Sequence, residues 1–406
     1  MSIAVLQKHE KIIISTLVFL LFPLAFFFSR SATWILAVGG ILGFLIARKS
    51  ISQLIRHPFL LSILSLIAFG GLSTFWSVDP FTSLSLTLRL LANFILGVSW
   101  SALLLQQPSE SIQTILSFLI AGVCVAAILL LGDYLLHNPW QNLLHISSAK
   151  AFVPLAVMLT IAAWPIALWF AEKYNFIISI LFLILMALLL LVIDCDTAPL
   201  SIITGLILGG FGYKWASSIG RFGQVISTIF IMSLPFAINT YLTTERIHQI
   251  NEKIHVFSHI HRLYTWQDIS QKIEKKWALG YGLDTSRHET VGGEMKNWPL
   301  TKHNGERIFI YTKAIPMHPH NAPLQWWLEL GVIGALLGAL INYQCLGYIR
   351  SLQGGMKAAL TLSLFINVSF VAYVNLGFWQ NWWLSSLWIL GGIMASYIRS
   401  DHFKLH

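Results

Sequence analysis

A series of long apolar stretches constrains this chain more than any other feature of its sequence. Each stretch approaches the ~20 residues that a helix needs to cross a ~30 Å hydrocarbon layer. Backbone groups in lipid must bond within the segment, and no alternating barrel pattern is present, so helices are expected. We predict an all-α membrane protein of about twelve transmembrane helices. The stretches are residues 12–28, 32–47, 59–75, 84–105, 112–132, 152–171, 176–193, 198–213, 222–242, 324–345, 357–375 and 382–398.

The composition agrees with a chain that lies mostly in a membrane. Hydrophobic residues make up 56% of the 406 residues and charged residues only 11%, whereas soluble domains are about 25% charged. The net charge of +9 does not indicate nucleic acid, because much of it falls in short loops between apolar stretches. We therefore expect membrane lipids, and no nucleic acid, as partners.

The basic residues in the short loops predict the orientation of the chain. They occur in alternate loops, which the positive-inside rule places in the cytoplasm. Both termini are then cytoplasmic, and the other loops face outward. These basic residues are Lys8, Lys11, Arg48, Lys49, Arg56, Lys173, Lys214, Arg221, Arg350, Lys357, Arg399 and Lys404.

One polar segment, residues 243–322, is too long to be a simple connection. It holds eight of the fourteen histidines, and structureless loops of this length are uncommon unless they are functional. Residues 247–256 and 266–276 read as short helices. We expect helices one to nine in residues 1–242, an outward-facing loop with short helices in 243–322, and helices ten to twelve in 323–406.

The sharpest local signal is the run from His318 to Pro323 at the end of this loop. Asn321 can cap a helix, and Pro323 suits its first turn. His320 then lies at a helix N-terminus, whose positive dipole end disfavours an imidazolium. A neutral imidazole can act as a general base, and the same helix end attracts phosphate.

Two other interpretations of these histidines stay open. His320 can simply cap or pack at the membrane interface. His318 and His320 can also form a zinc pair, but two positions along an extended segment should point to opposite faces. We expect no metal site.

A resemblance joins this run to the residues that follow. His320-Asn321, nine residues, and then Gly331-Val332-Ile333-Gly334 resemble the His-(Asn/Ser/Gln)-x9-Gly-x-x-Gly motif of bacterial O-antigen ligases, which ends their large periplasmic loop. The stretch 76–80 (Trp-Ser-Val-Asp-Pro), and the stretch 262–266 leading to 280–283, are also similar to segments of these proteins. The wider superfamily includes O-antigen polymerases and protein O-oligosaccharyltransferases.

The resemblance implies an enzyme at the periplasmic face of the bacterial inner membrane. Its donor would be a glycan linked to undecaprenyl diphosphate, and its acceptor a sugar hydroxyl of lipid A–core, with no cofactor. His320 matches the histidine thought to activate the acceptor, and Arg262 is the best match for a loop arginine that holds the diphosphate. A polymerase, a protein O-oligosaccharyltransferase and a transporter or flippase without chemistry are the alternatives.

The arginines also make chemical sense without the resemblance. A departing diphosphate gains charge, and the planar guanidinium fork matches it in bidentate geometry. Arg262 lies among aromatic residues, and Arg287 follows a glycine turn. Arg89 lies in an apolar span, where burying a charge costs free energy, so an ionisable residue there indicates a functional role. Each can instead be a snorkelling or surface arginine.

Two acidic features complete the candidate site. Glu329 lies roughly 10 Å along the helix from His320, at ~1.5 Å per residue, where it can orient a histidine, pair with an arginine or line a cavity. Family members often carry Ser-Arg before the eighth span, whereas this chain has Asp194-Cys195-Asp196-Thr197. Asp194 and Asp196 can serve a base, bind a cation, or be ordinary loop residues.

Overall fold

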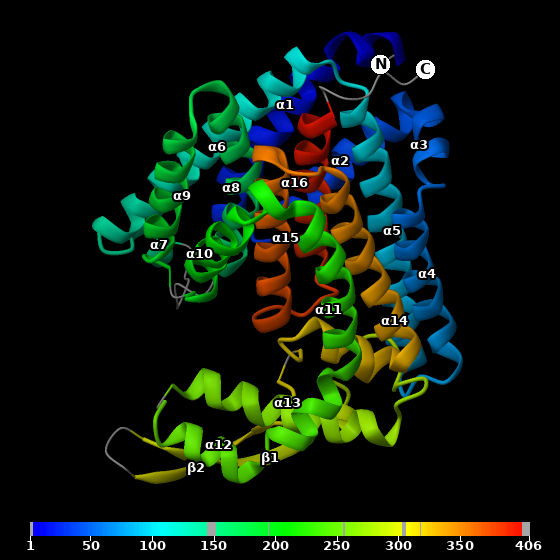
Figure 1. Ribbon diagram of the computed structural model, residues 1–406, viewed down its shortest axis with the longest axis vertical. Coiled ribbons are helices and arrows are strands. Elements are labelled where there is room, and N and C mark those ends of the chain that lie inside the picture. Colours follow the sequence, from blue (N-terminus) through cyan, green and yellow to red (C-terminus); the bar gives the residue numbers. More distant parts are fainter. Residues whose placement is uncertain are drawn as a thin grey trace.

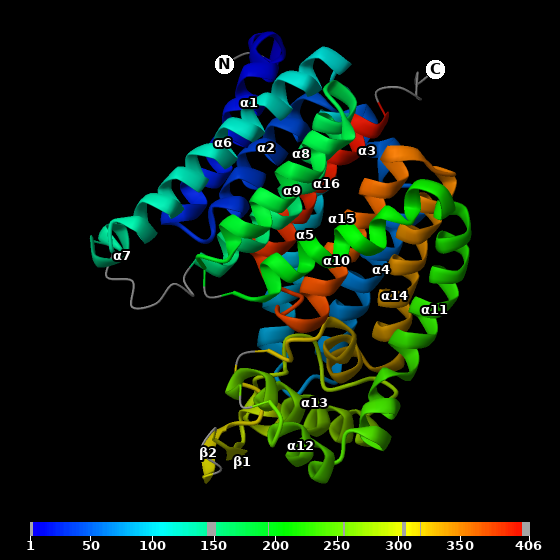
Figure 2. The same ribbon diagram turned by 60° about the vertical axis from the view of Figure 1, so that its left-hand side comes forward.

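The computed structural model describes residues 3–143, 152–193, 195–254, 256–302, 306–316 and 318–399. The chain forms a helical bundle with a smaller domain attached at one end (Figure 1). The helices α1 and α16 bring both ends of the described chain to the opposite end of the bundle (Figures 1 and 2).

Each of the twelve apolar stretches lies on a helix, which confirms an all-α membrane protein. The helices are α1 (Ile3–Phe27), α2 (Ser31–Ile46), α4 (Pro58–Leu72), α5 (Pro80–Leu105), α6 (Ser109–Leu135), α8 (Val153–Lys173), α9 (Phe176–Leu190), α10 (Thr197–Gly210), α11 (Gly212–Tyr241), α14 (Ala322–Ser351), α15 (Gly355–Val374) and α16 (Asn381–Arg399). Shorter elements between them are α3 (Arg48–Leu54), η1 (Ser73–Phe75) and α7 (Pro139–Leu143).

The number of membrane crossings stays a prediction. Within the described ranges, eight helices are long and apolar enough to span a bilayer. A ninth span is possible if α2 and α3, which meet at a 103° bend, act together. The apolar helices α9 and α10 have only 15 and 14 residues, so the structure by itself does not fix twelve crossings.

Helix α8 occupies the centre of the bundle. All of its residues from Leu155 to Trp169 are buried, as expected for a helix that is apolar on every side. Elsewhere small residues allow close helix packing. A Cβ at Gly43 of α2, for example, would lie 2.1 Å from the Ser99 carbonyl oxygen of α5.

The polar segment folds into a small domain, here called the loop domain, which contains α12 (Thr244–Asn251), α13 (Phe257–Lys275), η3 (Glu289–Gly293), β1 (Met295–Thr301) and β2 (Arg307–Lys313). Two helices were predicted here, but α13 begins nine residues earlier than expected. The antiparallel hairpin of β1 and β2 was not predicted. Its inward face meets α12 and α13 in a separate apolar cluster, where Tyr264 stacks on Trp298 at 5.0 Å.

Candidate active site

A break in α14 organises the region between the bundle and the loop domain. Gly331 interrupts the helix with φ 62° and ψ −157°, a backbone region open almost only to glycine. Residues 322–330 therefore form a separate short helical segment, and every one of them is buried. The prediction of one continuous helix from residue 324 to 345 is wrong at this point.

The loop-domain segment 277–282 fills the break with backbone hydrogen bonds. The amides of Tyr281 and Gly282 donate to the carbonyls of Leu328 and Glu329 at 3.0 and 2.8 Å, and the Val332 amide donates to Trp277 at 2.8 Å. These bonds satisfy carbonyls and an amide that a broken helix leaves without partners. A Cβ on Gly331 would lie 2.3 Å from the Ala278 carbonyl oxygen, so the two segments can pack this closely only because residue 331 is glycine.

The stretch 76–80 packs onto the same loop-domain segment. Trp76 donates its indole N–H to the Leu279 carbonyl at 3.1 Å, and the Val78 amide donates to Tyr281 at 3.0 Å. Asp79 caps α5 by accepting from the Thr82 amide at 3.0 Å. The stretches 76–80, 280–283 and 320–334, on which the resemblance rests, therefore meet in space.

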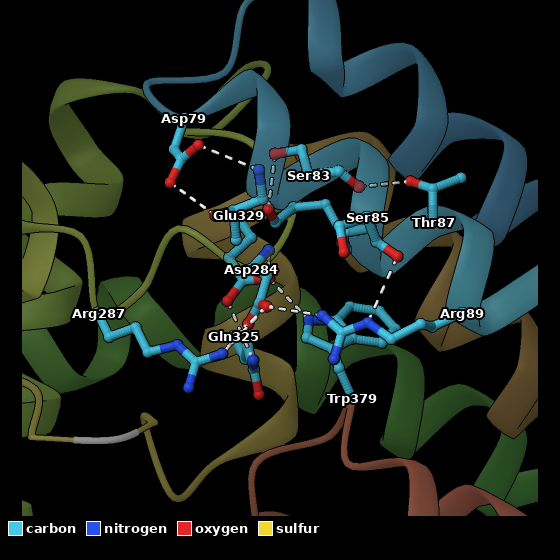
Figure 3. Close-up of polar contacts among 12 residues, drawn as sticks. Asp79, Ser83, Ser85, Thr87, Arg89, Asp284, Arg287, Gln325, Glu329 and Trp379 are labelled. Atoms are coloured by element: carbon cyan, nitrogen blue, oxygen red, sulfur yellow. Dashed lines mark hydrogen bonds and ion pairs between the residues drawn. The ribbon is translucent and has the colours of Figure 1, made fainter.

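Glu329 lies at the centre of this meeting point and is fully buried (Figure 3). Its carboxylate accepts from the Asp284 amide at 2.8 Å, the Gln325 amide group at 3.0 Å and the Trp379 indole at 2.7 Å, and also from the Ser286 hydroxyl. Four donors satisfy a buried carboxylate well. The side chain thus ties the loop domain to α14 and to the α15–α16 connection.

Arg89 and Arg287 approach a single carboxylate from two sides (Figure 3). The Nη2 atoms of Arg89 and Arg287 lie 3.7 and 3.2 Å from Asp284 Oδ2. The side chains of Arg89 and Arg287 are about half exposed, at 49% and 58%, whereas the Asp284 side chain is 14% exposed. Burial raises the pKa of Asp284, although both arginines act in the opposite direction.

His320 is held in one tautomer by a residue that the sequence analysis did not identify. His320 Nδ1 lies 2.6 Å from the carbonyl oxygen of Asn375, which can only accept, so Nδ1 carries the proton. Burial is the main cause that lowers the pKa of His320 to about 4, and Arg262 and His261 add to it. The ring is therefore neutral near pH 7, with Nε2 free to accept a proton.

His318 lies directly beside His320, contrary to the expectation of opposite faces. The ring centroids are 4.1 Å apart, because His320 adopts φ 55° and turns the chain. The His320 amide donates to His318 Nδ1 at 3.3 Å. Burial, with His320, Arg262 and Arg287, lowers the pKa of His318 to about 3. No group of three or more metal-ligating side chains occurs among the described residues.

Arg262 belongs to the histidine side of the site rather than to the Asp284 cluster. Its positive charge lowers the pKa of both His318 and His320. Burial lowers the pKa of Arg262 itself, against the opposing influence of Cys195 and Asp196. Within the part of the chain that the structure describes, no hydrogen bond or ion pair holds this guanidinium.

Several neighbours fix the histidine segment in place. Asn321 caps α14 by accepting from the Leu324 amide at 3.0 Å, as predicted. Trp266 donates its indole N–H to the Pro319 carbonyl at 2.9 Å. Gln325 links this helical start to the α15–α16 connection, since its carbonyl oxygen accepts from the Phe378 amide at 2.9 Å.

Asp194 lies outside the described residues.

The structure therefore brings six of the seven candidate residues into two adjoining groups around the start of α14, and Asn321 caps that helix. His318, His320 and Arg262 form one group; Arg89, Arg287 and Glu329 meet at Asp284 in the other. The positive charge of Arg287 also contributes to the lowered pKa of His318. Residues missed from the sequence are Asp284, Ser286, Gln325, Asn375 and Trp379.

Comparisons with known proteins match the region of the chain that contains the loop domain. Residues 181–338 match the family model described as O-antigen ligase. A Rickettsia typhi protein is 26% identical over 330 residues, or 80% of this chain and 77% of the relative. Proteins of Rickettsia conorii and Rickettsia felis are each 36% identical over 131 residues, which is 32% of this chain and only 30% of each relative. All three carry the provisional name polysaccharide ligase.

The matched region runs from α9 into α14 and contains Arg262, Asp284, His320 and Gly331. It therefore includes the whole loop domain and the break in α14, where the site is built. On these grounds the chain is a multi-pass membrane protein whose residues 181–338 are similar to O-antigen ligases.

Proposed function

We propose that this protein transfers a glycan from undecaprenyl diphosphate to a sugar hydroxyl of lipid A–core. The reaction takes place at the periplasmic face of a bacterial inner membrane, with both termini in the cytoplasm and the loop domain in the periplasm. The observation that carries the proposal is the neutral His320 ring, whose Nδ1–H donates to the Asn375 carbonyl and whose Nε2 has no hydrogen-bond partner among the described residues.

In the proposed reaction His320 Nε2 takes the proton of the acceptor hydroxyl as its oxygen attacks the anomeric carbon of the donor. The bond between that carbon and the diphosphate oxygen breaks, and its electron pair stays on the diphosphate. Arg262, Arg89 and Arg287 stabilise the growing negative charge, which is the kind of electrostatic effect that usually contributes most to catalysis. The proton on His320 then passes to solvent.

A transfer assay with the purified protein in nanodiscs tests this function. The protein receives the lipid-linked donor together with lipid A–core or with an acceptor protein. Glycan should appear on lipid A–core without added nucleotide. Product in which one donor glycan extends another on the lipid carrier would instead identify a polymerase, and glycan on a serine- or threonine-containing acceptor protein would identify a protein O-oligosaccharyltransferase. In sealed proteoliposomes, donor movement across the bilayer without any new glycosidic bond would identify a flippase.

Arg262→Ala should lower kcat/KM for donor transfer about 10²–10³-fold, the loss typical when one donor to a developing anion is removed. Arg262→Lys keeps the charge but loses the bidentate fork, so its loss should be smaller. Initial rates at varied donor concentration provide the measurement.

Arg246→Ala is the matched control, because Arg246 is exposed on α12 and donates to the Tyr241 carbonyl at 2.8 Å. Its kinetics should equal those of the wild-type protein. Unchanged donor kinetics in Arg262→Ala would remove this arginine from the site.

A further inference from the structure

The Asp284 carboxylate occupies the place between Arg89 and Arg287 where an anionic ligand would bind (Figure 3). Arg287 Nη2 donates to both carboxylate oxygens, at 3.4 and 3.2 Å, while Arg89 Nη2 lies 3.7 Å from one of them. The two arginines come from α5 and from the loop domain, so this one carboxylate bridges the bundle and the loop domain.

The carboxylate is fixed more firmly than the arginines it holds. The Asp284 backbone has φ 61°, and its amide donates to the buried Glu329 carboxylate at 2.8 Å. Arg89 and Arg287 are about half exposed. Their side chains can therefore turn toward a ligand while Asp284 stays in place.

The contacts of Asp284 use only part of what the two arginines offer. Each guanidinium has five N–H donors in a planar fork, and the contacts to Asp284 involve one nitrogen of each. A ligand with two phosphoryl groups can form a bidentate pair with each arginine, whereas a singly charged anion has no such advantage over the carboxylate already present.

We propose that Asp284 is a displaceable counter-ion that makes this arginine pair selective for a diphosphate and helps to release it. The donor diphosphate draws Arg89 and Arg287 away from Asp284. After glycan transfer, Asp284 competes for the arginines again and the lipid diphosphate leaves. This inference rests on the proposed function, in which both arginines bind the donor diphosphate.

Asp284→Asn tests the proposal with inorganic pyrophosphate as the probe. Asparagine tolerates a positive φ, so the fold should persist, as thermal unfolding would verify. The Ki of pyrophosphate should fall roughly three- to tenfold, on the scale of partly exposed ion pairs. The KM for donor should fall with it, while kcat falls because product release slows. The Ki of orthophosphate should fall by a larger factor, so that the selectivity for pyrophosphate decreases, since the competitor that excludes small anions is gone.

Asp79→Asn serves as the matched control. Asp79 also influences the Asp284 charge through space, but its carboxylate bonds Thr82 rather than an arginine, and asparagine also caps a helix. Its pyrophosphate Ki should change much less than that of Asp284→Asn, because no contact to an arginine is lost.

Each outcome decides a separate point. A Ki for pyrophosphate that is unchanged or higher in Asp284→Asn overturns the counter-ion role, and a joint rise in KM and fall in kcat would show that Asp284 only organises the site. Arg89→Ala and Arg287→Ala with unchanged donor KM would instead overturn the proposed diphosphate site itself.

Discussion

His320→Ala should lower the rate of glycan transfer about 10²–10⁴-fold, the range contributed by a positioned general base. The Nε2 lone pair is the proton acceptor in the proposed reaction, and alanine removes it together with the Nδ1–H that bonds the Asn375 carbonyl. Donor binding should be much less affected, because Arg262, Arg89 and Arg287 remain. Single-turnover rates with preformed donor complex separate these two effects.

Two further variants make this result specific. His320→Gln keeps an N–H donor for the Asn375 carbonyl but cannot accept the proton, so it should lose as much activity as His320→Ala. His259→Ala changes an exposed histidine of α13 in the same loop domain and should behave like the wild-type protein. Transfer at the wild-type rate in His320→Gln would rule out His320 as the base.

Gly331→Ala should have the second large effect, because it acts on the break in α14. The backbone conformation at Gly331 costs a non-glycine residue about 1–3 kcal/mol, and the new Cβ would meet the Ala278 carbonyl oxygen at 2.3 Å. The segment 277–282 must move away from α14. A displacement of ~1 Å at a catalytic site can cost about 10²-fold in rate, and we expect a loss of that size.

Hydrogen exchange provides the structural measurement for this variant. The amides of Tyr281, Gly282 and Val332, which bond across the break, should exchange faster in Gly331→Ala. Gly132→Ala in α6 is the control, since a Cβ there has no atom within 4 Å, and alanine should stabilise the helix by roughly 0.5–1 kcal/mol. Unchanged exchange and activity in Gly331→Ala would show that the break does not position the site.

The features of the site that could be predicted from the sequence are local ones. Apolar length predicts the helices, and the Asn321 cap with Pro323 predicts the start of α14 and so the place of His320. The sequence indicated the hairpin only weakly. Ile308 and Ile310 alternate with other residues in β2, as in a strand, but the sequence of β1 is polar and contains a proline, which is unusual in a strand.

The features that were missed depend on contacts between distant segments or on unusual backbone angles. Asn375 and Trp379 reach the site from the α15–α16 connection. Asn375 lies 55 residues after its partner His320, and Trp379 lies 50 residues after its partner Glu329. No spacing rule identifies such partners. The positive φ values at His320 and Asp284 explain why the histidines lie together and why Asp284 can meet two arginines, and an extended or helical backbone would place these side chains elsewhere.

The ionisation state of His320 tests the central claim most directly. A ¹⁵N difference spectrum of the histidine rings, with His320→Gln as the subtraction, reports both the tautomer and the titration of this one ring in nanodiscs. The account predicts a neutral ring at pH 7 with the proton on Nδ1 and a pKa of about 4. An imidazolium at pH 7, or a neutral ring with the proton on Nε2, would contradict it, because Nε2 could then accept nothing from an acceptor sugar.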